Sequence, residues 1–409
     1  MAVKMMEGNV TSPKGFKAAS CAAEIKYKGR EDMGMIYSQE PCAVAGTFTK
    51  NVVAAAPVIW DRDIVKKVGK AQAIVVNSGI ANAATGQQGL DICKVTAEHA
   101  ASVMGLTATD ILLGSTGVIG MQIDPEKINK GVDMMWPKLA DTYEAGHAAE
   151  LAMMTTDTLP KETAATVDVD GVTVTIGAQC KGSGMIHPNM CTMLCYITTD
   201  CDIEQSLLQE ALSSVVGDTF NMISVDGDTS TNDTCLVLAN GMAGNKKIVA
   251  KDANYDAFVE ALFEITKTLA KKMAGDGEGA TALFEVVING VDTVENAKVF
   301  AKSVVCSSLV KAAIYGHDAN WGRILCALGY SGVMFDPQKV DLTFSSEAGT
   351  IEIAKDGVAV NFSEEKATEI LSAKEVTATC NMNMGSASAT AWGCDLTYDY
   401  VKINADYRS

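Results

Sequence analysis

The sequence lacks any hydrophobic run long enough to cross a membrane. Its apolar stretches are short and interrupted by polar residues, whereas a membrane-spanning helix needs about 20 consecutive apolar residues. The first residues, Met1–Gly8, also lack the apolar core of a secretory signal. We therefore expect a cytoplasmic protein with no membrane partner.

Positive charge is also scarce. The chain has 33 Lys and Arg residues against 50 Asp and Glu residues, which gives a net charge of −17. Nucleic acids and anionic membrane surfaces attract basic patches. The charge therefore argues against nucleic acid as a partner, and we interpret the acidic surplus as a solvated surface that aids solubility.

Sequence motifs for metals and for nucleotide phosphates are absent. None of the 12 cysteines forms a C-x-x-C pair, and the four histidines show no H-E-x-x-H spacing. No glycine-rich run ends in Gly-Lys-Ser or Gly-Lys-Thr, which excludes a P-loop. We expect no metal, and we interpret the dispersed cysteines as reduced, buried thiols.

Hydrophobic residues make up 48% of the 409 positions, which is enough to bury a large core. Residues 71–76, 110–113 and 283–288 are typical of strands, and 166–175 alternate like a hairpin around Asp170-Gly171. Helical patterns cover 89–104, Pro125 to about Tyr143, 203–216, 254–273, 294–314 and 363–371, and strands dominate the rest of 340–403. This mixture predicts an α+β or mixed α/β layered sandwich.

The segment Lys181–Cys195, KGSGMIHPNMCTMLC, places a threonine where it could act as a nucleophile. A threonine hydroxyl needs a base beside it, and a cut before Thr192 would supply its own α-amine as that base. Gly182 and Gly184 allow backbone geometries that other residues avoid, and the residues after Thr192 are typical of a buried strand. An ordinary loop-to-strand junction is the alternative, and these features alone leave both open.

The glycine-rich segment Gly114–Gly120 follows a strand and precedes a helix, a position where backbone amides often bind an anion. Its G-x-x-G-x-x-G spacing differs from the dinucleotide fingerprint G-x-G-x-x-G, and no matching acidic residue follows. A nucleotide-binding oxidoreductase is therefore disfavoured.

Alternating carboxylates in Asp226–Asp233 invite a metal interpretation. The segment does not fit a calcium loop, because position six is Thr231 rather than Gly and position twelve is Val237 rather than Glu. Short polar side chains also bond readily to nearby backbone. We interpret the segment as a structured turn that supports an active centre.

Five segments together resemble the ornithine acetyltransferase (glutamate N-acetyltransferase) family, and they occur in the family's order over most of the chain. They are MTTDT at 154–158 with Pro160-Lys161, KGSGMIHPNMCTML at 181–194, SVDGDTSTNDT at 224–234, HDANWGR at 317–323 and YVKINADYRS at 400–409. The resemblance implies a layered fold of the N-terminal-nucleophile type and self-cleavage between Cys191 and Thr192. The products would be an α chain, 1–191, and a β chain, 192–409, assembled as an α2β2 heterotetramer.

The resemblance also implies a reaction and a set of residues. An acetyl group would pass from N-acetylornithine to glutamate, giving ornithine and N-acetylglutamate, in arginine biosynthesis and without a cofactor. Thr192 would be the nucleophile and would carry the acetyl group, while Thr116 and Gly117 would hold the oxyanion. The substrate site would comprise Thr155, Lys181, Thr192, Glu278, Asn404 and Ser409.

Two positions depart from the family's usual pattern, namely Cys191 in place of alanine and Ser409 in place of threonine. Both replacements are small, and Ser409 keeps the hydroxyl. Use of acetyl-CoA as a second donor stays open. An amidase or aminopeptidase of similar fold, which would pass the acyl group to water, is the alternative function.

Overall fold

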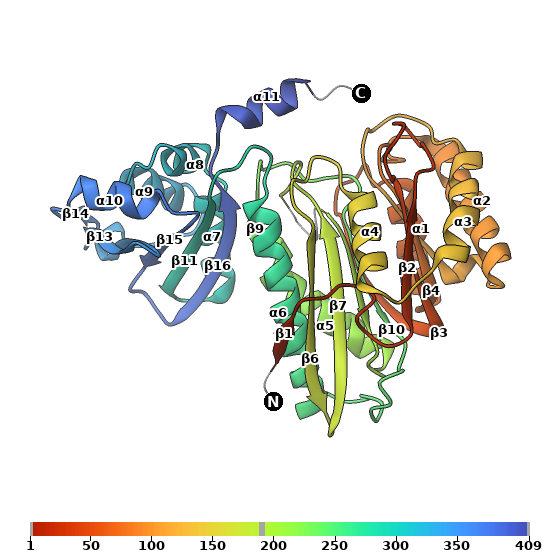
Figure 1. Ribbon diagram of the computed structural model, residues 1–409. Coiled ribbons are helices and arrows are strands. Elements are labelled where there is room, and N and C mark those ends of the chain that lie inside the picture. Colours follow the sequence, from red (N-terminus) through yellow and green to blue (C-terminus); the bar gives the residue numbers. More distant parts are fainter. Residues whose placement is uncertain (1–2, 188–192, 407–409) are drawn as a thin grey trace.

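The computed structural model of the protein describes residues 3–187 and 193–406. This part of the chain folds around two β-sheets (Figure 1). The larger, nine-stranded sheet has the order β1-β6-β7-β8-β10-β3-β4-β5, with β2 paired to β3. Its strands are β1 Lys4–Met6, β2 Phe16–Cys21, β3 Met33–Phe48, β4 Lys70–Asn77, β5 Ile111–Ser115, β6 Lys161–Val169, β7 Val172–Lys181, β8 Leu194–Thr199 and β10 Thr234–Ala239.

Strands β8 and β10 lie in the middle of this sheet. β7 and β8 pair antiparallel with Lys181 opposite Leu194, while β8 and β10 run parallel with Leu194 beside Thr234. β10 then pairs antiparallel with β3. This register brings the end of β7 and the starts of β8 and β10 to one edge of the sheet.

Helices cover both faces of the larger sheet, which explains why its central strands are apolar without alternation. On β4, Ala73 and Val75 belong to a cluster that includes α2 and α3, whereas Ile74 and Val76 belong to one that includes α1 and α4. The six helices around this sheet are α1 Ala56–Lys67, α2 Gly86–Met104, α3 Pro125–Met135, α4 Tyr143–Met153, α5 Gln205–Asp218 and α6 Ala253–Gly275.

The smaller sheet has seven strands in the order β14-β13-β12-β15-β11-β16-β9. Helix α6 lies between the two sheets (Figure 1), and one hydrophobic core contains residues of both. The elements are β9 Ile223–Ser224, β11 Leu283–Val291, β12 Asp341–Ser346, β13 Gly349–Lys355, β14 Val358–Ala359, β15 Glu375–Asn381, β16 Ala387–Cys394, α7 Val294–Val305, α8 Ser308–Tyr315, α9 Trp321–Gly329, α10 Glu364–Leu371 and α11 Tyr398–Asp406.

The layered α/β fold predicted from the sequence is confirmed, but three helix predictions were wrong. The helix that begins at Pro125 ends at Met135, because Pro137 cannot continue the hydrogen-bonding pattern. The predicted helix 294–314 is two helices, since the Ser307 side chain accepts from the Val310 N–H and begins α8 anew. Residues 398–403 lie in a region predicted to be mostly strand but belong to helix α11, in which no residue is buried and Tyr398 and Val401 are exposed.

The prediction of free, buried thiols is confirmed for most of the described cysteines, but it was wrong for Cys326, which is exposed on α9, and for Cys306, which is half-buried. All eleven described cysteines are free thiols, and nine of them are buried. Over the same part of the chain, no helix combines the length and apolar character needed to cross a membrane.

Candidate active site

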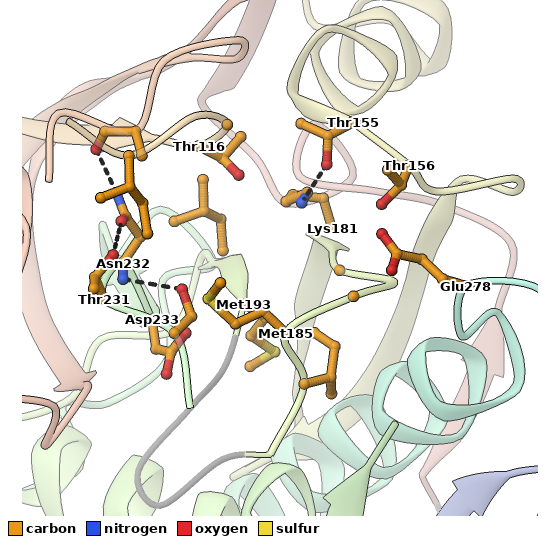
Figure 2. Close-up of a pocket in the computed structure, with 18 of the residues that line it drawn as sticks. Thr116, Thr155, Thr156, Lys181, Met185, Met193, Thr231, Asn232, Asp233 and Glu278 are labelled. Atoms are coloured by element: carbon orange, nitrogen blue, oxygen red, sulfur yellow. Dashed lines mark hydrogen bonds between the residues drawn. The ribbon is translucent and has the colours of Figure 1, made fainter. Parts of the chain in front are cut away.

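A cavity of about 150 Å³ opens at the edge where β7 ends and β8 and β10 begin (Figure 2). Polar side chains from both halves of the chain line it, together with a few apolar ones. The lining residues include Thr116, Gly117, Ile119, Thr155, Thr156, Lys181, Gly184, Met185, Met193, Ser230, Thr231, Asn232, Asp233, Glu278 and Asn404.

The cavity brings together every described residue that the sequence assigned to the site. These are Thr116, Gly117, Thr155, Lys181, Glu278 and Asn404. Cys191, Thr192 and Ser409 lie outside the described residues, so their roles stay predictions. Met193, which directly follows Thr192, is 5% exposed and forms part of the cavity wall.

Lys181 is the cation of the cavity. It is the last residue of β7, and its Nζ donates to Thr155 Oγ1 at 2.8 Å (Figure 2). The same Nζ lies 3.7 Å from Asp157 Oδ2. An ammonium group on a rigid strand end, with a neutral hydrogen-bond partner and its nearest carboxylate 3.7 Å away, is suited to bind a further carboxylate.

Asp157 fixes the loop that follows α4. Its carboxylate accepts from the N–H groups of Thr155 at 3.0 Å and Gly182 at 2.6 Å. Burial alone would raise the pKa of Asp157, but the ammonium groups of Lys181 and Lys161 outweigh it and hold the pKa well below the usual aspartate range. The loop is therefore anchored by a charged carboxylate.

Thr116 and Gly117 belong to a loop packed against the turn after β4. The Thr116 N–H donates to the Asn77 carbonyl at 3.0 Å, so this N–H is already engaged. Gly117 has a φ of +126°, and a Cβ there would overlap the backbone of Gly79. The Thr116 hydroxyl points into the cavity (Figure 2), so it is suited to donate a hydrogen bond to a bound oxygen.

Glu278 supplies a carboxylate to the same cavity. It is 8% exposed, and its Oε2 accepts from Asn404 Nδ2 of α11 at 2.8 Å. Thr156 lies beside it (Figure 2). With Lys181 and Glu278 present together, the cavity can bind a molecule that carries both a carboxylate and an amine.

The segment Asp226–Asp233 was predicted to be a turn that supports an active centre, and Asn232 and Asp233 of this segment form part of the cavity wall. Asn232 Nδ2 donates to the carbonyls of Ala81 and Ser115 at 2.6 and 2.8 Å, which ties this wall to the Gly117 loop. Asp233, 1% exposed, precedes β10. Both residues directly precede the apolar strand β10, which pairs with β8, and this position is the sequence feature that indicates a place in the cavity wall.

The turn at Asp226 supports the segment that leads toward Thr192. Asp226 accepts from the N–H groups of Met185 at 2.6 Å and Ile186 at 2.9 Å, and Met185 adopts a left-handed φ of +55°. Among the described residues, no group of three His, Cys, Asp or Glu side chains could hold a metal ion.

His187 does not line the cavity. Its Nδ1 lies 3.1 Å from Ser224 Oγ and 3.5 Å from Cys306 Sγ. Burial, together with the nearby Lys302 ammonium, lowers the pKa of His187 to about 4, so the ring is neutral at physiological pH. This environment favours a structural role.

The fold and the cavity define a layered α/β protein with a small, charged site for an amino-acid-like ligand. The sequence pattern of the ArgJ family matches residues 17–409. The chain therefore belongs to the ArgJ family.

Individual relatives agree with this assignment. The arginine biosynthesis bifunctional protein ArgJ of Symbiobacterium thermophilum is 48% identical over 409 residues, and that of Caldanaerobacter subterraneus is 46% identical over 407 residues; 100% of this chain and of each relative is covered. A solved chain of the ArgJ protein from Bacillus halodurans is 46% identical with a TM-score of 0.50. That match covers 52% of this chain and 98% of the solved chain.

We predict that Gly184→Ala destabilises the protein by up to about 1 kcal/mol, because the new Cβ would overlap the Glu278 carboxylate and force that flexible side chain away from Asn404. Gly217→Ala in α5 is the matched control. A Cβ at Gly217 meets no atom within 4 Å, so this change should stabilise the helix by up to about 1 kcal/mol. Urea unfolding of both variants measures the difference, and equal stabilities would contradict the predicted overlap.

Proposed function

We propose that the protein transfers an acetyl group from N-acetylornithine to glutamate and so forms ornithine and N-acetylglutamate. The observation that carries the proposal is the cavity of an ArgJ-family chain in which Lys181 and Glu278 present opposite charges beside Thr116 and Gly117. Lys181 pairs with the carboxylate of the substrate, and Glu278 with an amine. The protein is an acetyltransferase of arginine biosynthesis, and it needs no metal or organic cofactor for these steps.

Thr192 is the proposed nucleophile. Its hydroxyl attacks the acetyl carbonyl, its α-amine accepts the hydroxyl proton, and the same amine later protonates the departing amine of ornithine. The oxyanion that forms is held by the Thr116 hydroxyl and the Gly117 N–H. Glutamate then attacks the acetyl-threonine and leaves as N-acetylglutamate.

This chemistry requires a free α-amine on Thr192, and we propose self-cleavage between Cys191 and Thr192 as its source. Two observations support the cut. Met193 forms part of the cavity wall, and the solved Bacillus halodurans chain is almost completely matched by only about half of this sequence. A half-length chain is what a cleaved precursor yields.

The α chain, 1–191, and the β chain, 192–409, stay associated in this proposal. Two copies of the αβ unit form the α2β2 heterotetramer implied by the resemblance, with a mass near twice the 43.0 kDa of one precursor. The free thiols support a reducing cytoplasm as the place of action.

We predict that Thr192→Ala leaves the precursor intact and without acetyl transfer, whereas Thr192→Ser cleaves slowly and keeps some activity. Serine retains the hydroxyl but loses the methyl group that restricts its rotamers. Denaturing electrophoresis detects the two chains, and mass spectrometry after addition of N-acetylornithine should locate an acetyl group on the fragment that begins at Thr192. An active preparation of uncut chain would refute the mechanism.

Thr116→Val should lower kcat about 10²–10³-fold, because valine keeps the shape but removes the hydroxyl donor. Thr116→Ser is the matched control and should retain most activity. Both variants must first be shown to be fully cleaved. If valine and serine give the same kcat, the hydroxyl does not stabilise the oxyanion and the Gly117 N–H acts without it.

The alternative, an amidase or aminopeptidase, differs in the fate of the acetyl group. When glutamate is present, an acetyltransferase forms N-acetylglutamate in proportion to ornithine. An amidase instead releases acetate, with or without added glutamate. We also propose acetyl-CoA as a second donor, because the relatives are named bifunctional. Formation of N-acetylglutamate from acetyl-CoA and glutamate alone tests this activity, and its absence leaves the protein with one donor.

A further inference from the structure

Four charged side chains form a buried row behind the cavity wall. Lys181 Nζ lies 3.7 Å from Asp157 Oδ2, Lys161 Nζ lies 2.8 Å from Asp157 Oδ1, and the same Nζ lies 2.5 Å from Asp276 Oδ2. Side-chain exposures are 9% for Lys181, 0% for Asp157, 1% for Lys161 and 6% for Asp276. With so little water nearby, these charges act on one another with weak screening.

Asp157 is shared between the two lysines. Two backbone N–H groups fix its carboxylate, and the Lys161 ammonium approaches it more closely than the Lys181 ammonium does. The negative charge of Asp157 is therefore divided between the two lysines. Lys181, which alone among the four lines the cavity, is left with a positive charge that is only partly compensated.

Asp276 completes the row from the other side. Its carboxylate accepts from the N–H and the hydroxyl of Thr158, in the loop that carries Thr155, and from the ammonium of Lys161. Ser183 Oγ donates to the Asp276 carbonyl at 2.7 Å. The residue thus joins the loops on both sides of Lys181 to the segment that carries Glu278.

We propose that this row of alternating charges sets how strongly Lys181 attracts the carboxylate of the substrate, with Lys161 and Asp276 as positioning residues. The inference rests on the proposed acetyl transfer. Lys161 holds the Asp157 charge away from Lys181, and Asp276 keeps Lys161 in place. The row should not affect the binding of a substrate that lacks the carboxylate.

Two double variants separate this electrostatic role from a general role in folding. Lys161→Met/Asp276→Asn leaves Asp157 with Lys181 as its only lysine partner, so the attraction for a substrate carboxylate should fall. Lys161→Met/Asp157→Asn removes the competing carboxylate, so Lys181 should keep its attraction. Each variant loses one positive and one negative buried charge, which makes the pair closely matched in net charge.

The probes are N-acetylornithine and its α-carboxamide, each assayed as acetyl donor at one fixed glutamate concentration with cleaved, folded enzyme. We measure the ratio of kcat/KM for the carboxylate donor to that for the carboxamide donor. This ratio should fall about tenfold in Lys161→Met/Asp276→Asn and stay at or above the wild-type value in Lys161→Met/Asp157→Asn. A merely structural role would change both donors equally, and equal ratios in the two variants would overturn the inference.

Asp276→Asn alone extends the test should either double variant fail to fold. Asp276→Asn removes the carboxylate that keeps Lys161 in place, so the ratio should fall, but by less than in Lys161→Met/Asp276→Asn. A ratio equal to that of the wild type would overturn the inference. The activity of the wild type shows whether the proposed function or only this inference fails. If the wild type transfers no acetyl group from N-acetylornithine to glutamate, the proposed function fails and this inference with it, whereas an active wild type with equal variant ratios refutes the inference alone.

Discussion

The structure depends on the insertion of β8 and β10 between β7 and β3. Both neighbours come from the part of the chain before residue 188, whereas β8 and β10 come from the part after residue 192. Neither part can therefore complete the larger sheet alone, because each would expose unpaired backbone groups at strand edges. The same insertion places Lys181, Leu194 and Thr234 in one row, and so it creates the edge on which the cavity opens.

Charge burial is the second constraint, and it follows from the first. Lys161 and Asp157 belong to the first part of the chain and Asp276 to the second, so their row crosses between the two. Removing one partner would leave a buried charge uncompensated, a cost of about 3–5 kcal/mol. The row therefore favours one arrangement of the two parts and holds the Thr155 loop against Lys181.

The sequence predicts the regular elements well where one physical signal dominates. The hairpin at Asp170-Gly171 and the helix near 89–104 follow from alternation and helical periodicity. The cavity is different, because Thr116, Lys181 and Glu278 are far apart in the chain and only strand order brings them together. The resemblance predicted their roles. Asn232 lies in a segment predicted to support an active centre, but only the parallel pairing of β10 with β8 places it in the cavity wall.

The connection between β7 and β8 shows why a cut there would be compatible with the fold. These strands are antiparallel neighbours whose ends pair at Lys181 and Leu194, so two to five residues would suffice to join them. The chain instead runs from Gly182 to Met193, and its first part is held by hydrogen bonds to Asp226 rather than by the strands. Breaking a bond within this connection removes no pair of the β7–β8 ladder. The fold thus holds the described residues up to His187 and from Met193 onward through contacts other than the connection between them.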